Sequence, residues 1–156
     1  ANALRIVQLE IKKFGFGLKI FDGYRPQRAV DHFMRWIADG QNTLMKEKFF
    51  PRVAKGDLVS DGYIAQKSGH SRGSSVDLTL VYLASKTEVP MGTQWDFFDP
   101  LSFSLSYGVT PMERSNRLFL RRQMRAAGFL PLAEEWWHFT LGNEPYPNSY
   151  FNLPID

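Results

Sequence analysis

The sequence predicts a single α+β domain in which helices pack around a central, mainly antiparallel sheet. Stretches with the apolar spacing of amphipathic helices are interspersed with short segments rich in β-branched and aromatic residues. The 156 residues are 44% hydrophobic and 15% aromatic, which is enough to build one buried core. We therefore expect one domain over residues 1–156.

The first part of the chain is expected to hold two helices separated by a short strand. Residues 2–14 have apolar side chains at helical spacing, and GFG at 15–17 provides a stop. Residues 18–21 have strand composition and run into 22–26, where glycine and proline interrupt regular pairing. The second helix is expected over 26–38. Its core-facing stripe would consist of Val30, Phe33, Met34 and Ile37.

The middle of the chain combines loops with the clearest strand. Residues 39–67 contain recurring glycine and proline and are expected to form loops around a short helix near 44–49. The β-branched and aromatic run at 76–83 predicts a strand. The connection 84–110 is unusually long for a compact domain, which is typical of a lid or a binding loop.

The C-terminal third predicts one well-marked helix and one strand. Residues 110–113 match a capping box with proline at the first helical position, so a helix should begin there, run to Ala127 and stop at Gly128. Residues 134–141 have the composition of a strand. Four arginines at three- and four-residue spacing would form a solvated face of the helix without a catalytic role. They are Arg114, Arg117, Arg121 and Arg125.

Composition excludes several classes of function. The net charge of +3 gives little support for a nucleic-acid partner, which usually needs a concentrated basic face. No stretch approaches the roughly 18 consecutive apolar residues that cross a bilayer, so we expect no membrane span. The chain has no cysteine, so disulfides and thiolate zinc sites are excluded. A metal ion would need histidine and carboxylate ligands.

The sequence SGHSRGSSVDLTL at 68–80 holds two candidate metal ligands. Small residues between His70 and Asp77 allow the chain to fold back, so both side chains can converge on one ion. His138 can supply a third ligand, and a hydrolytic zinc site keeps its fourth position open for water. On spacing alone, however, a polar turn with His70 exposed and Asp77 paired to an arginine is the more common structure.

Two charged side chains could complete a catalytic site. Glu135 could act as a general base near His138, but residues three apart on a strand face opposite ways, so Glu135 must then precede the strand. Otherwise Glu135 is a solvated charge and His138 packs among aromatic residues. Arg25, at a strand end, suits an oxyanion or, equally, an ion pair with Asp22. His32 is expected on a helix surface or partly buried.

Three motifs together carry a family resemblance: DGYRPQRAV at 22–30, SGHSRGSSVDLTL at 68–80 and EEWWHFTL at 134–141. They resemble the VanX-type D-alanyl-D-alanine dipeptidases, zinc metallopeptidases related to D,D-carboxypeptidases and the Hedgehog signalling domain. The ending EPYPNSYFNLP at 144–154 is similar to that family as well. The resemblance runs in the same order from the first helix to the C-terminus.

The resemblance implies one zinc ion at one side of the sheet, with His70, Asp77 and His138 as its ligands. It also implies that Glu135 is the general base and that Arg25 faces the tetrahedral oxyanion.

Two further positions match substrate-binding residues of the family, Ser68 and, more loosely, Asp96, which would hold the free ammonium of the substrate. Relatives often have alanine where this chain has Ser75, a change between small residues. Family members also have a further N-terminal segment that contributes to the substrate pocket, and we expect this chain to lack it.

The implied activity is zinc-dependent hydrolysis of D-Ala-D-Ala, in bacterial cell-wall peptide metabolism or glycopeptide resistance. The nearest alternative is a related carboxypeptidase or endopeptidase that acts on longer peptidoglycan stem peptides. An alternative from another class is a non-catalytic zinc-scaffold binding protein, which would need neither Glu135 nor Arg25. The protein would be bacterial, and either cytoplasmic or periplasmic.

Overall fold

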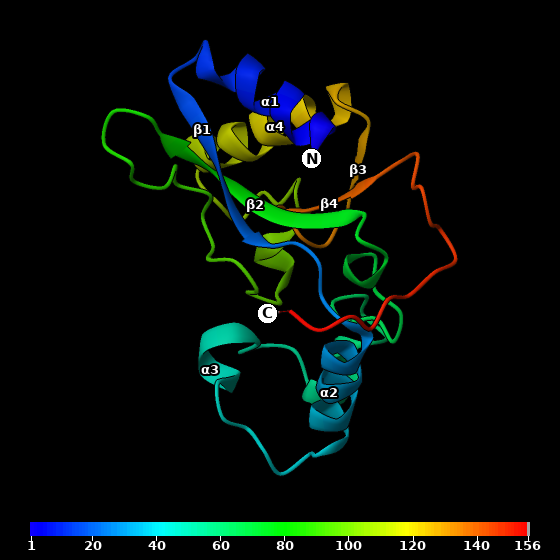
Figure 1. The fold of residues 1–156 in the computed structure, drawn as a ribbon. Coiled ribbons are helices and arrows are strands. Elements are labelled where there is room, and N and C mark those ends of the chain that lie inside the picture. Colours follow the sequence, from blue (N-terminus) through cyan, green and yellow to red (C-terminus); the bar gives the residue numbers. More distant parts are fainter. Residues whose placement is uncertain (156) are drawn as a thin grey trace.

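A four-stranded antiparallel sheet forms the centre of the structure, a computed structural model that describes residues 1–155 (Figure 1). Its strands lie in the order β1-β2-β4-β3, and each neighbouring pair is antiparallel. The predicted α+β class with an antiparallel sheet is confirmed. The strands are β1 (Phe16–Asp22), β2 (Ser75–Tyr82), β3 (Phe129–Pro131) and β4 (His138–Leu141).

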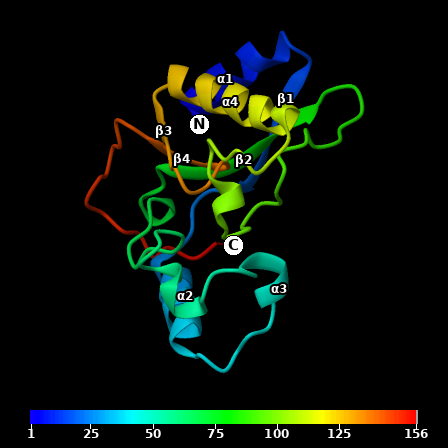
Figure 2. The ribbon, with the colours of Figure 1, turned by 180° about the vertical axis from the view of Figure 1, so that it is seen from behind.

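Helices lie on both sides of this sheet. Helices α1 (Asn2–Lys12) and α4 (Pro111–Ala126) pack against each other on one side, and both views show them together (Figures 1 and 2). Helices α2 (Gln27–Ala38) and α3 (Lys46–Phe49) lie on the other side. None of the helices in residues 1–155 is long and apolar enough to cross a membrane.

The main core lies between the sheet and the pair α1 and α4. Side chains alternate along a strand, so Leu78 and Leu80 of β2 enter this core, while Asp77 and Thr79 point to the opposite face. Burying each large apolar side chain contributes about 1.5–3 kcal/mol. A second, smaller cluster on the side of α2 consists of Phe50, Val53, Leu58 and Tyr63. The polar face of β2 is thus left between two apolar layers.

Helix α2 differs from its prediction in how its apolar stripe is used. Val30 is buried, but Phe33 is 36% exposed and borders a cavity instead of entering the main core. The helix ends at Ala38 as expected. The apolar stripe of α2 therefore lines a cavity as well as contributing a buried side chain.

Arg117 corrects the prediction that the arginines of α4 form a solvated face. Its side chain is only 1% exposed, and burial lowers its pKa to about 10. The guanidinium donates to the carbonyls of Met91 (2.6 Å), Leu101 (2.7 Å) and Phe103 (2.9 Å). These carbonyls lie in the long connection, which lacks sheet partners there, so Arg117 supplies the missing donors. The segment 91–103 is thereby tied to α4.

Candidate metal centre and substrate cavity

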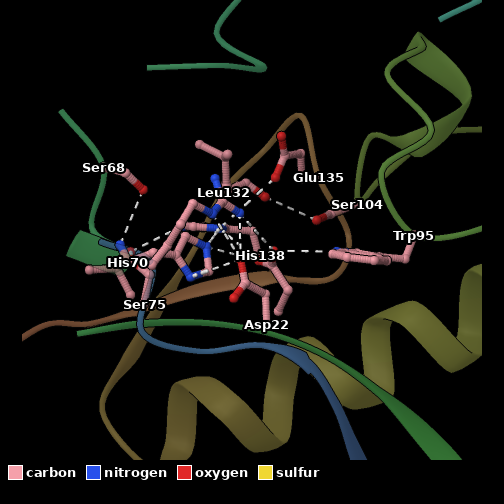
Figure 3. Close-up of polar contacts among 12 residues, drawn as sticks. Asp22, Ser68, His70, Ser75, Trp95, Ser104, Leu132, Glu135 and His138 are labelled. Carbon is pink, nitrogen blue, oxygen red and sulfur yellow. Dashed lines mark hydrogen bonds and ion pairs between the residues drawn. The ribbon is translucent and has the colours of Figure 1, made fainter. Parts of the chain in front are cut away.

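Three side chains from separate segments meet on the face of the sheet opposite α1 and α4, and Figure 3 shows two of them, His70 and His138, close together. His70 lies in the short 3₁₀ turn His70–Arg72, Asp77 lies on β2, and His138 begins β4, directly opposite Asp77 in the ladder. His138 Nδ1 lies 2.9 Å from Asp77 Oδ1 and 3.2 Å from His70 Nε2, and His70 Nε2 lies 3.3 Å from Asp77 Oδ1. The three atoms form a nearly equilateral triangle.

This triangle fits a metal ion. Tetrahedral zinc with bonds of about 2.0–2.1 Å separates its ligand atoms by about 3.3–3.4 Å, close to the edges observed here. His70 Nδ1 lies 2.7 Å from the carbonyl of Gly23, which can only accept, so Nδ1 is the protonated nitrogen and Nε2 keeps its lone pair. His138 Nε2 contacts Thr140 Oγ1 at 3.3 Å, which leaves His138 Nδ1 to bind a metal ion together with His70 Nε2. The group His70, Asp77 and His138 can therefore hold a metal ion.

The electrostatics of Asp77 favour a cation at this point. Burial by itself raises the pKa of Asp77, but the close contacts with His138 and His70 outweigh it and hold the pKa well below its usual range. The side chain is thus an ionised carboxylate that is only 2% exposed as a residue. A buried carboxylate of this kind requires positive charge beside it.

Glu135 lies in the turn just before β4. Residues three apart on a strand face opposite ways, so this is where Glu135 must lie if it is to serve the same site as His138. It is 6% exposed, so it is not a solvated charge, and Oε2 lies 3.9 Å from His138 Nδ1. Burial raises the pKa of Glu135 well above its ordinary value, and the charges of Asp77 and Asp96 raise it further. A carboxylate in this environment readily takes up a proton.

Arg25 forms the ion pair with Asp22 that the sequence offered as one of two alternatives. Its guanidinium donates to Asp22 Oδ2 through Nε (2.9 Å) and Nη2 (2.6 Å). Nη2 also lies 3.9 Å from Asp77 Oδ2, and the group stacks over the ring of Phe33, 5.3 Å from its centroid. Arg25 is therefore ion-paired and still borders the cavity beside the metal group.

A cavity of about 470 Å³ opens at this group. Its volume lies within the range of small-molecule sites. It is lined by the polar side chains of the metal group and by apolar side chains of α2 and the second cluster, including Phe33, Trp36 and Phe50. The cavity is bordered by all seven site residues that the sequence and its resemblance indicated. They are Arg25, Ser68, His70, Asp77, Asp96, Glu135 and His138.

Ser68 and Asp96 hold different positions in this cavity. Ser68 Oγ accepts from the backbone N–H of His70 at 3.2 Å, so it shapes the turn that carries His70. Asp96 has a left-handed backbone with φ of 58°. Burial, followed by the charge of Asp77, raises the pKa of Asp96 to about 7, while Arg25 opposes the shift. A cationic group next to Asp96 would relieve its burial cost.

Sequence reasoning missed the side chains that hold the metal group in place. Trp95 Nε1 donates to Asp77 Oδ2 at 3.3 Å. Thr140 Oγ1 contacts His138 Nε2 and lies 2.6 Å from Ser75 Oγ. The hydroxyl of Ser75 therefore helps to position Thr140, which in turn contacts His138. Thr140 follows His138 by two residues and shares its face of β4, a period-2 signal that the sequence did contain. No comparable local signal points to Trp95.

A histidine–aspartate group that can hold a metal, with a buried glutamate beside it in a cavity, is the site of a metal-dependent hydrolase. Comparison with known proteins gives the family. Residues 1–156 match the peptidase M15 family, described as D-Ala-D-Ala dipeptidase. The chain belongs to this family of metallopeptidases.

Three relatives show how much of the chain the similarity covers, and each is named D-alanyl-D-alanine dipeptidase. The Enterococcus faecium protein is 48% identical over 141 residues, which cover 90% of this chain and 70% of the relative. The Enterococcus faecalis protein is 44% identical over 155 residues, which cover 99% and 77%. The Streptomyces coelicolor protein is 44% identical over 153 residues, which cover 98% and 76%.

Proposed function

We propose that this protein hydrolyses the dipeptide D-Ala-D-Ala to D-alanine, using one zinc ion held by His70, Asp77 and His138. The observation that carries the proposal is the convergence of this metal group with Glu135 and Arg25 on one cavity. The names of the relatives support the choice of substrate. Residues 1–156 would act as one dipeptidase domain in bacterial cell-wall peptide metabolism or glycopeptide resistance.

Glu135 is the proton carrier of the proposed reaction. When bound, zinc supplies a Lewis acid for the scissile carbonyl and lowers the pKa of water. The Glu135 carboxylate takes one proton from the attacking water as the carbon–oxygen bond forms. It then gives that proton to the leaving amine as the carbon–nitrogen bond breaks, so the carboxylate is regenerated. The raised pKa of Glu135 suits a group that both takes and returns a proton.

The remaining polar side chains bind the substrate and stabilise the reacting carbonyl. Arg25 holds a fixed positive charge near the metal group and stabilises the negative charge that develops on the carbonyl oxygen. Asp96 pairs with the substrate ammonium, which would otherwise be desolvated without a partner. Ser68 keeps the turn of His70 in place at the same wall of the cavity.

One assay tests this function directly. Purified protein incubated with D-Ala-D-Ala should release D-alanine, and a chelator should abolish the release until zinc is added back. A matched incubation with a stem pentapeptide separates the nearest alternative, because a carboxypeptidase or endopeptidase would cleave the longer peptide. A protein that binds zinc and cleaves neither peptide would be the non-catalytic scaffold.

Arg25→Ala is expected to lower kcat by about 10²–10³-fold, the usual cost of removing one donor to an oxyanion, and to raise KM much less. Steady-state kinetics on D-Ala-D-Ala measure both constants. Arg28→Ala is the matched control, because Arg28 lies on the same segment but bonds to Asn152 and does not border the cavity. A variant with raised KM and normal kcat would make Arg25 a substrate-binding residue only.

A further inference from the structure

The two carboxylate oxygens of Asp77 have different surroundings. Oδ1 faces His138 Nδ1 at 2.9 Å and His70 Nε2 at 3.3 Å. Oδ2 accepts from the indole N–H of Trp95 at 3.3 Å, and Figure 3 shows this ring lying to one side of the histidines. The structure therefore gives one oxygen to the metal group and the other to Trp95.

The ring of Trp95 is held in place by β1. It stacks on Phe21 with ring centroids 5.2 Å apart and an angle of 16° between the planes. Phe21 lies at a register shift, because Ile20 pairs with Leu78 while Asp22 pairs with the next residue, Asp77. A bulge of this kind directs two successive side chains toward one face. It brings Phe21 to Trp95 and Asp22 to Arg25 on the same side of the sheet.

The segment that carries Trp95 is also held by contacts before and after this residue. Thr93 Oγ1 accepts from the indole of Trp136 at 2.8 Å and contacts Ser102 Oγ at 3.0 Å. Arg117 holds the carbonyls of Met91 and Leu101 from the other side. The indole N–H thus points at Asp77 from a segment with little freedom to follow a moving carboxylate.

Without this donor, the second oxygen of Asp77 would have only a distant partner among residues 1–155. Its other polar neighbour is Arg25 Nη2, 3.9 Å away, and that nitrogen already donates to Asp22. A carboxylate without a donor on Oδ2 is free to rotate and to offer either oxygen, or both, to a cation. Groups that orient a metal ligand in this way typically change metal affinity by 10–100-fold.

We propose that Trp95 is a positioning residue that reserves Asp77 Oδ1 for the metal ion by binding Asp77 Oδ2. The inference rests on the proposed function, since it assumes that this group holds the catalytic zinc. Trp95 directly precedes Asp96, which borders the cavity. One segment therefore carries both the residue that positions Asp77 and the residue proposed to bind the substrate ammonium.

The test is Trp95→Phe, which keeps an aromatic ring for Phe21 and removes the N–H. Competition with a chromogenic chelator should show a zinc Kd raised by about 10–100-fold. The visible absorption spectrum of the cobalt-substituted protein should also change, because the binding mode of Asp77 changes. Phe21→Leu keeps the N–H and removes only the ring on which Trp95 stacks, so it should raise the zinc Kd by less than Trp95→Phe does.

A replacement that changes only the N–H protects the test against misfolding. Trp95→benzothienylalanine keeps the shape of the indole with sulfur in place of the N–H, and thermal unfolding checks its fold. An unchanged zinc Kd and cobalt spectrum in this variant would overturn the inference, even if D-Ala-D-Ala is cleaved. Conversely, a wild-type protein that binds zinc without cleaving the dipeptide would refute the proposed function, while a weakened zinc Kd in the variant would still support the role of Trp95.

Discussion

Glu135→Gln is expected to lower kcat for D-Ala-D-Ala by about 10²–10⁴-fold, the contribution that general acid–base catalysis typically makes. Glutamine fills the same buried space but can neither take a proton from water nor return it to the leaving amine. Glu135 lies outside the triangle of atoms that could hold the metal ion, with Oε2 3.9 Å from His138 Nδ1. The variant should therefore keep one zinc per chain. Stopped assays of D-alanine release, together with elemental analysis of the same sample, measure both quantities.

Glu134→Gln is the matched control for this experiment. Glu134 is the adjacent glutamate, lies partly exposed and does not border the cavity, so kcat should stay close to wild type. A Glu135→Gln variant with nearly normal kcat would remove Glu135 from the mechanism. Loss of zinc from that variant would instead place Glu135 among the groups that hold the metal.

The helices were predictable because their signals are local. Thr110 and Glu113 form the capping box that their spacing indicated, and the helix between Pro111 and Ala126 follows from it. Helix α1 ends at Lys12, just before the expected glycine stop at 15–17. Such signals lie within a few residues of the element that they define, so one sequence is enough to find them.

The strands were less predictable because pairing depends on distant partners. β3 has only three residues and was not predicted, and the strand expected over 134–141 pairs only from His138 onward. The composition of EEWWHFTL favours a strand throughout, but Trp136 and Trp137 are buried in the turn before β4. Tertiary packing overrides β propensity at these positions.

The metal group was predictable only through the family resemblance. On spacing alone, a polar turn with an exposed His70 was the more common structure, yet His70 is 2% exposed. The pairing of Asp77 with His138 across β2 and β4 joins residues 61 positions apart, and no periodicity in the sequence reveals it. The burial of Arg117 has the same origin, because it depends on carbonyls of a distant loop.

His138→Ala is expected to lose the zinc ion and, with it, D-Ala-D-Ala hydrolysis. The substitution removes the only group that contacts both other members of the triangle at 3.2 Å or less. Changing a group behind a ligand costs 10–100-fold in metal affinity, so removing a ligand itself should cost more than about 100-fold. Elemental analysis after dialysis against a weak chelator measures the loss.

His32→Ala distinguishes ligand loss from a general effect of removing a histidine. His32 is the one histidine outside the metal group and lies exposed on α2, where it borders the cavity without reaching the metal group, so this variant should keep its zinc. Full zinc stoichiometry in His138→Ala would mean that the ion is bound by other groups.

Because Asp77 is buried and ionised beside His138, the zinc-free His138→Ala variant should also unfold at a lower temperature than zinc-loaded wild type. A metal-dependent shift in Tm that disappears with His138 would connect ligand, charge and stability in one measurement.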